Sequence, residues 1–175
     1  MKEITIVCPI FNEEENIELF IKNFNEIFKD HPDYKFSILF ADNNSTDSSR
    51  EILKKICAER KDIKYIRYAK NNGVMKSLFN TIKHVDTDAC AVFDCDLQDD
   101  PKLLNEFIKN WELEIKIIYG KRVKRKEIFL LGFFRNIFKK LSNYLRGYEI
   151  EIESGAWFLD KEVIRQIRHD EYEPF

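Results

Sequence analysis

Two aspartates near the middle of the chain carry the clearest chemical signal. Asp94 and Asp96 stand two positions apart in the run DCDLQDDP, directly after the apolar segment 89–93. Side chains two residues apart in an extended chain point to the same side. Two carboxylates at this spacing suit Mg²⁺ or Mn²⁺, which keeps the rest of its shell for water and phosphate. A solvated aspartate-rich turn is the alternative, and the full run through Pro101 favours the metal site over it.

A further acidic residue ends another apolar segment. Asp42 follows FSILFA (36–41) and begins the polar stretch DNNSTDSS. Its carboxylate could accept a hydrogen bond from the N–H of a nucleobase. The same stretch predicts a turn that leads into a helix, capped by Ser45 or Thr46. The two interpretations are compatible, and the sequence leaves both open.

An aromatic residue stands at the end of the first apolar segment. Phe11 follows ITIVCP (4–9), and Asn12 is the expected N-cap of the helix that comes next. The Phe11 ring could stack on a nucleobase or pack onto that helix, and the surrounding residues do not decide between these two positions.

All these residues belong to a chain in which short apolar segments alternate with amphipathic helices. Between the segments, apolar residues recur at helical spacing, as Ile17, Phe20, Ile21 and Phe24 do. This alternation predicts an α/β protein whose mostly parallel sheet is covered by helices on both faces. The expected strands are 4–9, 36–41, 63–68, 89–93 and 115–119.

The polar residues lie where such a sheet binds its ligands. In open α/β sheets that place is the carboxyl ends of the strands. Here the carboxyl ends carry the polar residues of 9–13, 42–45, 70–73 and 94–98. We therefore expect one binding site along that edge of the sheet.

Composition and charge limit the function classes. Apolar residues make up 44% of the 175 residues, which excludes a disordered chain. There are 29 Lys and Arg against 31 Asp and Glu, so the net charge of −2 gives no indication of nucleic acid. Four cysteines without a C-x-x-C pair indicate reduced thiols in a cytoplasmic protein.

One segment differs from this even balance. Residues 116–146 contain ten Lys or Arg and one acidic residue, Glu127. The apolar residues of 129–145 fit one wide helical face. A helix of this kind can lie in a membrane interface or form a core helix with a solvated basic face. Residues 121–146 are therefore a candidate for peripheral contact with the cytoplasmic face of a membrane, and the core alternative stays open.

Six segments together resemble a known family. VCPIFNEEENI, ADNNSTDSS, KNNG, FDCDLQDDP, GKRVKR and SGAWFLD follow one another in this order. The chain resembles the family 2 glycosyltransferases of GT-A fold over residues 4 to about 165. DLQ-D-x-P and GKRVKR resemble the branch that loads sugars onto polyprenyl phosphates. The resemblance implies a single GT-A domain over residues 1–175, and we expect a C-terminal segment to be missing.

The resemblance also implies roles for individual residues. The donor-binding residues would be Pro9, Phe11, Asn12, Glu13, Asp42, Asn71, Gly73 and Asp94. The metal ligands, which hold Mg²⁺ or Mn²⁺ on the donor diphosphate, would be Asp94, Asp96 and Gln98. The catalytic residues would be Asp94, Asp96, Arg122 and Arg125, with the two arginines near the donor phosphates or the acceptor phosphate.

The chain departs from the family pattern in two places. Asn43 stands where the family often has a second aspartate. Residues 155–158 read GAWF where the polyprenyl-phosphate branch usually reads GDFR. Ala156 and Phe158 therefore replace an acidic and a basic residue in a segment that the resemblance places toward the acceptor.

The basic residues bear on the acceptor. A hydroxyl acceptor needs a general base, and relatives that act on glycan hydroxyls carry a Glu-Asp pair that this chain lacks. A phosphate monoester is already largely dianionic near pH 7, with a second pKa of about 6. It needs cations rather than a base, and Arg122 and Arg125 supply them. The sequence thus predicts an inverting glycosyltransferase that moves a sugar from a nucleotide-diphosphate sugar, UDP favoured over GDP, to a polyprenyl phosphate.

Two other functions stay open. One is transfer to a glycan hydroxyl in cell-surface polysaccharide synthesis, and the other is a non-catalytic module that binds nucleotide sugars. A dinucleotide-binding Rossmann protein is disfavoured, because no G-x-G-x-x-G follows the first strand. The oligomeric state is left open.

Overall fold

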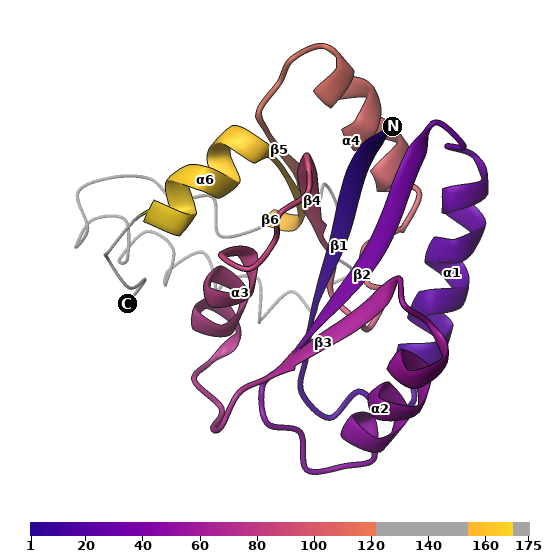
Figure 1. Cartoon of the computed structure of the whole chain (residues 1–175), viewed down its shortest axis with the longest axis vertical. Coiled ribbons are helices and arrows are strands. Elements are labelled where there is room, and N and C mark those ends of the chain that lie inside the picture. Colours follow the sequence, from indigo (N-terminus) through magenta and orange to yellow (C-terminus); the bar gives the residue numbers. More distant parts are fainter. Residues whose placement is uncertain (122–153, 170–175) are drawn as a thin grey trace, which may run out of the picture.

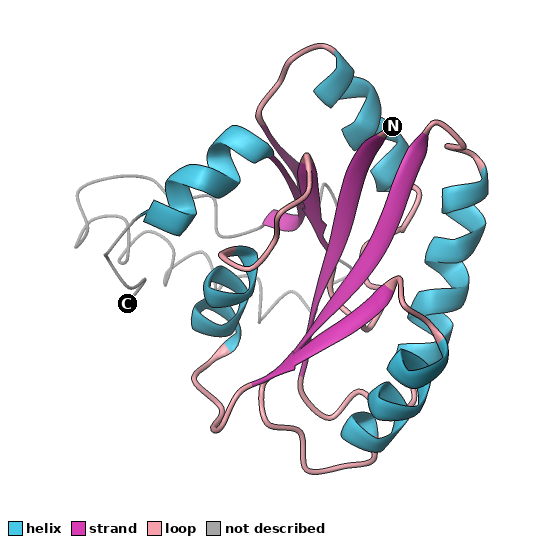
Figure 2. Ribbon diagram, viewed as in Figure 1, coloured by secondary structure: helices cyan, strands magenta, loops and turns pink. Residues whose placement is uncertain are grey.

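The computed structural model describes residues 1–121 and 154–169 of the chain. They form one six-stranded sheet with helices on both faces (Figures 1 and 2). No helix in these two ranges is long and apolar enough to cross a membrane. The elements in chain order are β1 (Lys2–Ile10), α1 (Ile17–Lys29), β2 (Tyr34–Asp42), α2 (Ser49–Glu59), β3 (Ile63–Arg67), α3 (Val74–Ile82), β4 (Ala89–Val92), α4 (Leu103–Glu112), β5 (Ile117–Lys121), β6 (Ser154–Asp160) and α6 (Lys161–His169).

The sheet is mostly parallel. Its strand order is β3-β2-β1-β4-β6-β5. β1 pairs in parallel with β2 and β4, and β2 pairs in parallel with β3, whereas β6 runs antiparallel to β4 and β5. The predicted architecture and its five strands are confirmed. The strand β6 coincides with SGAWFLD, which the sequence identified only as a motif.

Alternation along the strands divides the apolar side chains between two cores. In β1, Ile4, Ile6 and Cys8 belong to the core beneath α1, α2 and α4, whereas Val7 belongs to the core beneath α3 and α6. Figure 1 shows these two groups of helices on opposite faces of the sheet. The first core is rich in phenylalanine, and the Phe24 ring lies 4.9 Å from that of Phe93. These buried rings fix the sheet against α1 and α4.

The first helix begins later than the sequence suggested. α1 starts at Ile17, and Asn16 is its N-cap residue, so the prediction that Asn12 caps this helix is wrong. The Asn16 N–H donates to the Glu13 carbonyl at 2.9 Å, which forms a turn ahead of the helix. Asn12 adopts a positive φ of 58°, outside the helical range. Residues 11–16 therefore form a loop at the edge of the sheet.

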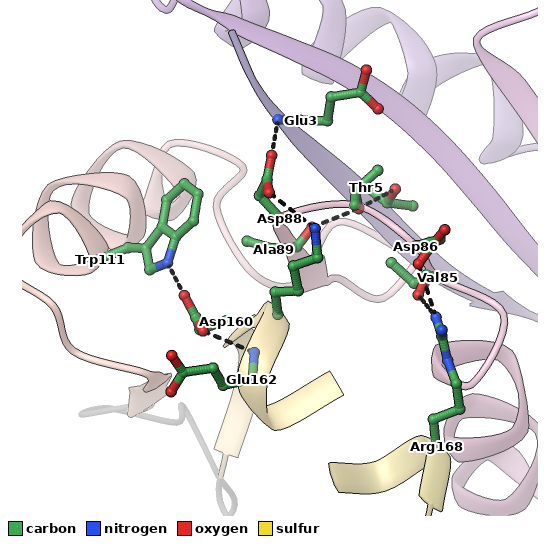
Figure 3. A network of polar contacts seen from close by, with 12 residues as sticks. Glu3, Thr5, Val85, Asp86, Asp88, Ala89, Trp111, Asp160, Glu162 and Arg168 are labelled. Atoms are coloured by element: carbon green, nitrogen blue, oxygen red, sulfur yellow. Dashed lines mark hydrogen bonds and ion pairs between the residues drawn. The ribbon is translucent and has the colours of Figure 1, made fainter. Parts of the chain in front are cut away.

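Polar contacts tie β6 and α6 to the other elements (Figure 3). The Trp111 indole N–H donates to Asp160 at 2.7 Å. The Glu3 N–H donates to Asp88 at 3.0 Å, and Lys161 Nζ lies 3.4 Å from the same carboxyl. The Glu3 N–H and the Lys161 ammonium hold the pKa of Asp88 below its usual value. These bonds connect the last strand and helix to α4 and β1.

The two departures in β6 are core positions. Ala156 is 1% exposed and Phe158 is 0% exposed, and both lie in the core beneath α4. The Phe158 ring lies 6.1 Å from that of Phe107 and 5.5 Å from that of Trp111. The expectation that Ala156 and Phe158 lie toward the acceptor is therefore wrong for this chain. An unpaired charge at either place would be buried away from water.

This packing predicts a stability effect without a binding effect. Phe158→Ala should lower the free energy of unfolding by about 3–5 kcal/mol, because it opens a cavity among packed rings. Urea denaturation measures this loss. Phe11→Ala, at a ring that is 44% exposed, is the control and should change stability by at most about 0.5 kcal/mol. A Phe158 variant of normal stability that binds UDP poorly would contradict the core assignment.

Candidate functional site

A cavity of about 180 Å³ lies at the carboxyl ends of the parallel strands. The structure brings together five of the predicted residues here: Pro9, Phe11, Glu13, Asp94 and Asp96. The other lining residues are Ile10, Asn43, Val74, Ser77 and Cys95. A larger hollow of about 480 Å³ lies elsewhere on the sheet, and no predicted site residue lines it. The structure thus has a cavity at the edge of the sheet where the sequence predicts a binding site.

The paired aspartates reach this cavity from the end of β4. Cys95 between them is 2% exposed, whereas both aspartates are exposed, so the chain presents two carboxylates to solvent on one side. Asp96 accepts hydrogen bonds from the Gln98 backbone N–H at 3.2 Å and from the Gln98 side-chain amide at 2.6 Å. Leu97 makes the tight turn between them with a φ of 55°. The third predicted ligand, Gln98, is therefore in direct contact with the second.

The pair forms no larger cluster. Within residues 1–121 and 154–169, no group of three or more His, Cys, Asp or Glu side chains is placed to hold a metal ion. Two carboxylates are what Mg²⁺ commonly takes from a protein when substrate phosphates and water complete its octahedral shell. The donor set thus fits a metal shared with a bound diphosphate.

Two buried thiols lie close to the paired aspartates Asp94 and Asp96. Cys8 in β1 and Cys95 are both buried, and both are free thiols. Burial raises the pKa of the Cys8 thiol well above its ordinary value, and the neighbouring Cys95 thiol and the charges of Asp94 and Glu13 raise it further. The Cys8 thiol therefore stays neutral and adds no negative charge beneath the carboxylates.

Asn12 joins the loop after β1 to the loop after β2. Its side-chain oxygen accepts hydrogen bonds from the Thr46 N–H at 2.8 Å and the Thr46 hydroxyl at 3.2 Å. Its own N–H donates to the Ser45 hydroxyl at 3.0 Å, and the Glu13 N–H donates to the Ser49 hydroxyl at 3.0 Å. Asn12 is not among the lining residues, and its contacts hold the segment that carries Phe11 and Glu13.

Asp42 is fully buried at the end of β2. One carboxylate oxygen accepts a hydrogen bond from the Ser45 N–H at 2.8 Å, which is the contact of the turn interpretation. The other oxygen is buried without a hydrogen-bond partner among the described residues, and the Arg67 Nε lies 3.7 Å away. This oxygen is ion-paired with Arg67 but accepts no hydrogen bond, and a buried acceptor without a hydrogen bond is costly. A donor group on a ligand would satisfy it.

Arg67 and the residues around it were not predicted. Arg67 ends β3 directly beside Asp42 in the strand register, and its guanidinium also donates to Asn44 at 2.9 Å. The signal was present in the sequence, because a charged residue at the carboxyl end of an expected strand points to the same edge as Asp42. Ser77 and Val74 in α3 gave no such signal, because they follow an ordinary helical pattern.

Asn43 organises the loop that follows β3. Its side-chain amide donates to Asn71 at 2.7 Å, and its oxygen accepts from the Ser77 hydroxyl at 2.7 Å and the Asn72 N–H at 3.2 Å. The same Asn71 oxygen accepts from the Gly73 N–H at 2.9 Å. Gly73 has a φ of 84°, which a side chain rarely tolerates. The predicted residues Asn71 and Gly73 thus shape the start of α3 beside the cavity.

The remaining predictions lie outside the described residues. Arg122, Arg125 and almost all of the basic segment 121–146 fall in the range 122–153. They stay predictions.

Comparison with known proteins gives a family match. The model of the family described as glycosyl transferase family 2 matches residues 5–168. A putative glycosyltransferase of Bacillus subtilis, CsbB, is 29% identical over 154 residues, which cover 87% of this chain and 46% of that protein. The bactoprenol glucosyl transferase of Shigella phage SfX is 28% identical over 168 residues, which cover 95% of this chain and 55% of that protein. The chain thus spans about half the length of these relatives.

Solved structures share the fold. The mannosyltransferase PcManGT of Pyrobaculum calidifontis, in complex with GDP-Man and Mn²⁺, has a TM-score of 0.62 and 18% identity over 94% of this chain and 46% of its own. Glucosyl-3-phosphoglycerate synthase of Mycobacterium tuberculosis, in complex with Mn²⁺, UDP and glucosyl-3-phosphoglycerate, has a TM-score of 0.63 and 17% identity over 93% of this chain and 58% of its own. The GT-A type predicted from the sequence is confirmed.

The bonds of Asn43 predict the effect of an aspartate at this position. Asn43→Asp removes the donor to Asn71 and sets a carboxylate against an amide oxygen, so the free energy of unfolding should fall by about 1–3 kcal/mol. The melting curve measures this loss, and titration with UDP should show weaker binding.

Asn72→Asp is the matched control. It introduces the same charge at the residue next to Asn71. Asn72 is exposed, and it contacts Asn43 through its backbone N–H and not through its side chain. Equal melting temperatures and UDP affinities for the two variants would contradict the role of the Asn43 amide.

Proposed function

Because the chain belongs to glycosyl transferase family 2, we propose that it transfers a sugar from a nucleotide-diphosphate sugar to a polyprenyl phosphate, with UDP favoured over GDP as the nucleotide. The observation that carries this proposal is the cavity at the carboxyl edge of the sheet, where Asp94 and Asp96 meet Pro9, Phe11 and Glu13. In this proposal, residues 1–175 belong to one GT-A catalytic domain.

The donor occupies the cavity. Phe11, whose ring is partly exposed at the lining, stacks on the nucleobase, and Pro9 and Glu13 line the same pocket. The Asp42 oxygen that lies near Arg67 and accepts no hydrogen bond in the structure accepts one from a base N–H, while the other oxygen keeps the turn closed. Asn12, Asn71 and Gly73 belong to the donor set as residues that shape the surrounding loops.

The two carboxylates hold the divalent cation. Asp94 and Asp96 are its protein ligands, and Gln98 completes the protein set while its amide nitrogen orients Asp96. Bound Mg²⁺ or Mn²⁺ supplies Lewis-acid stabilisation of the charge that develops on the leaving diphosphate. Without a cation, two carboxylates would face the anionic diphosphate and repel it.

Charge favours a phosphate as the acceptor group. A phosphate monoester is largely dianionic near pH 7, so it attacks without a general base. Arg122 and Arg125 hold that phosphate, and the basic segment 121–146 brings the protein to the cytoplasmic face of a membrane. Relatives named bactoprenol glucosyl transferase support a polyprenyl acceptor.

Metal dependence gives a direct test of the donor site. Asp96→Asn should weaken UDP-sugar binding in Mn²⁺ at least about tenfold, or about 1.4 kcal/mol, and should leave the melting temperature unchanged because Asp96 is exposed. Calorimetric titration with and without EDTA measures the effect.

Asp100→Asn is the matched control, since it removes the same charge four positions away and its oxygen can still accept from the Lys102 N–H. Donor affinity that is the same in Mn²⁺ and in EDTA would refute the metal role.

Transfer itself is tested with labelled sugar. The wild-type chain, incubated with labelled UDP-sugars and undecaprenyl phosphate in detergent, should place label in an acid-labile lipid fraction. Arg122→Ala or Arg125→Ala should impair use of the acceptor more than binding of the donor, because the proposal assigns these cations to the acceptor phosphate. Label found only in water-soluble glycan, with none in lipid, would refute the phosphate acceptor.

A further inference from the structure

An apolar groove of about 370 Å³ lies on the face of the sheet that carries α3 and α6. Its volume falls in the range of small-molecule sites. Eight apolar or aromatic residues from α3, β5, β6 and α6 line it, and none of them is charged. The groove shares no lining residue with the cavity at Asp94 and Asp96. It is therefore a separate feature that the donor site does not explain.

The floor of the groove is unusually exposed for apolar side chains. Ile117 and Tyr119 of the strand β5, which stands at the end of the strand order, are 58% and 55% exposed. Contiguous apolar surface of this kind marks a place where another apolar group binds. Trp157 of β6 lies beside them, with its ring 6.4 Å from that of Phe79 in α3.

One end of the groove lies close to the edge of the sheet that carries Asp94 and Asp96. In the strand register, Tyr119 lies opposite Trp157, and Trp157 lies opposite Val92, two residues before Asp94. Two strand spacings, about 10 Å, separate β5 from β4. Helix α3 joins the two features, because Ser77 lines the cavity and Phe79 lines the groove.

We propose that this groove holds the first isoprene units of the acceptor chain. The inference rests on the proposed function, in which the acceptor is a polyprenyl phosphate. Such a molecule has an anionic head and a branched apolar chain. The head belongs at the carboxyl edge near Asp94, and the chain matches an uncharged groove whose residues Tyr119 and Trp157 lie near that edge. A charged peptide would find no oppositely charged partner among the lining side chains.

Binding of short prenyl phosphates tests the groove without requiring turnover. Isopentenyl phosphate has one isoprene unit and farnesyl phosphate has three, with the same phosphate head. The wild-type chain should bind farnesyl phosphate at least about tenfold more tightly, because its additional units leave water. Trp157 lies in the groove, so its fluorescence should change on titration, and Trp157→Phe should abolish the change.

Ile117→Ser is the decisive variant. It makes an exposed edge position polar, and a melting curve confirms that the protein is folded. The preference for farnesyl phosphate should fall to less than about threefold, whereas the affinity for isopentenyl phosphate should not change. Leu19→Ser, at a position 47% exposed on α1, is the matched control and should keep the full preference.

Two results would overturn the proposal. One is an undiminished preference for farnesyl phosphate in Ile117→Ser. The other is a change of oligomeric state, in which the wild type sediments as a dimer and Ile117→Ser as a monomer while the preference for farnesyl phosphate is the same in both. That result would assign the groove to a second copy of the chain. Failure of the proposed function looks different: the wild type would bind both prenyl phosphates with the expected preference and transfer no sugar to undecaprenyl phosphate.

Discussion

Parallel pairing of β1 with β2 and with β4 is the constraint on which the candidate site depends. The register sets Ile10 opposite Asp42, Asp42 opposite Arg67, and Val7 opposite Val92. Because parallel strands end at the same edge, loops that lie up to about 90 positions apart in the sequence meet there. A slip of one residue in any of these pairings would turn every side chain of that strand to the other face. The register that builds the two cores therefore also builds the site.

The loops at this edge are held by hydrogen bonds that backbone N–H groups donate to side-chain oxygens. Asn12 binds the N–H of Thr46, and Asn43 binds the N–H of Asn72. Each such bond contributes about 0.5–1.5 kcal/mol to stability, so no single bond is decisive. Their common effect is to fix the cavity before a ligand arrives, which lowers the ordering cost of binding. Conversely, the exposed carboxylates of Asp94 and Asp96 place negative charges close together, and a cation relieves that repulsion.

Much of this arrangement could be predicted from the sequence, because apolar periodicity reports local structure directly. The five expected strands and the polar carboxyl edge followed from it. The position of Asn12 did not, because its asparagine chemistry suits a cap and a loop contact equally, and the choice is made by Thr46, which is 34 positions away.

The last strand was also outside the reach of local patterns. SGAWFLD forms a strand by pairing between β4 and β5, and only that pairing turns Ala156 and Phe158 into the core beneath α4 and Trp157 toward the core beneath α3 and α6. A family motif indicated which residues are unusual there, but the direction of each side chain depends on the register. The missed partner of Asp42, Arg67, has the same cause, since adjacency of β2 and β3 is a tertiary property.

The central claim is that Asp94 and Asp96 bind a divalent cation together with the donor diphosphate. Crystals of the chain grown with UDP and Mn²⁺ test it most directly, through the anomalous difference density of manganese. The account predicts a single strong peak within about 2.0–2.3 Å of carboxylate oxygens of both aspartates and in contact with the UDP phosphates. A UDP molecule bound in the cavity with manganese density elsewhere, or with none, would contradict it.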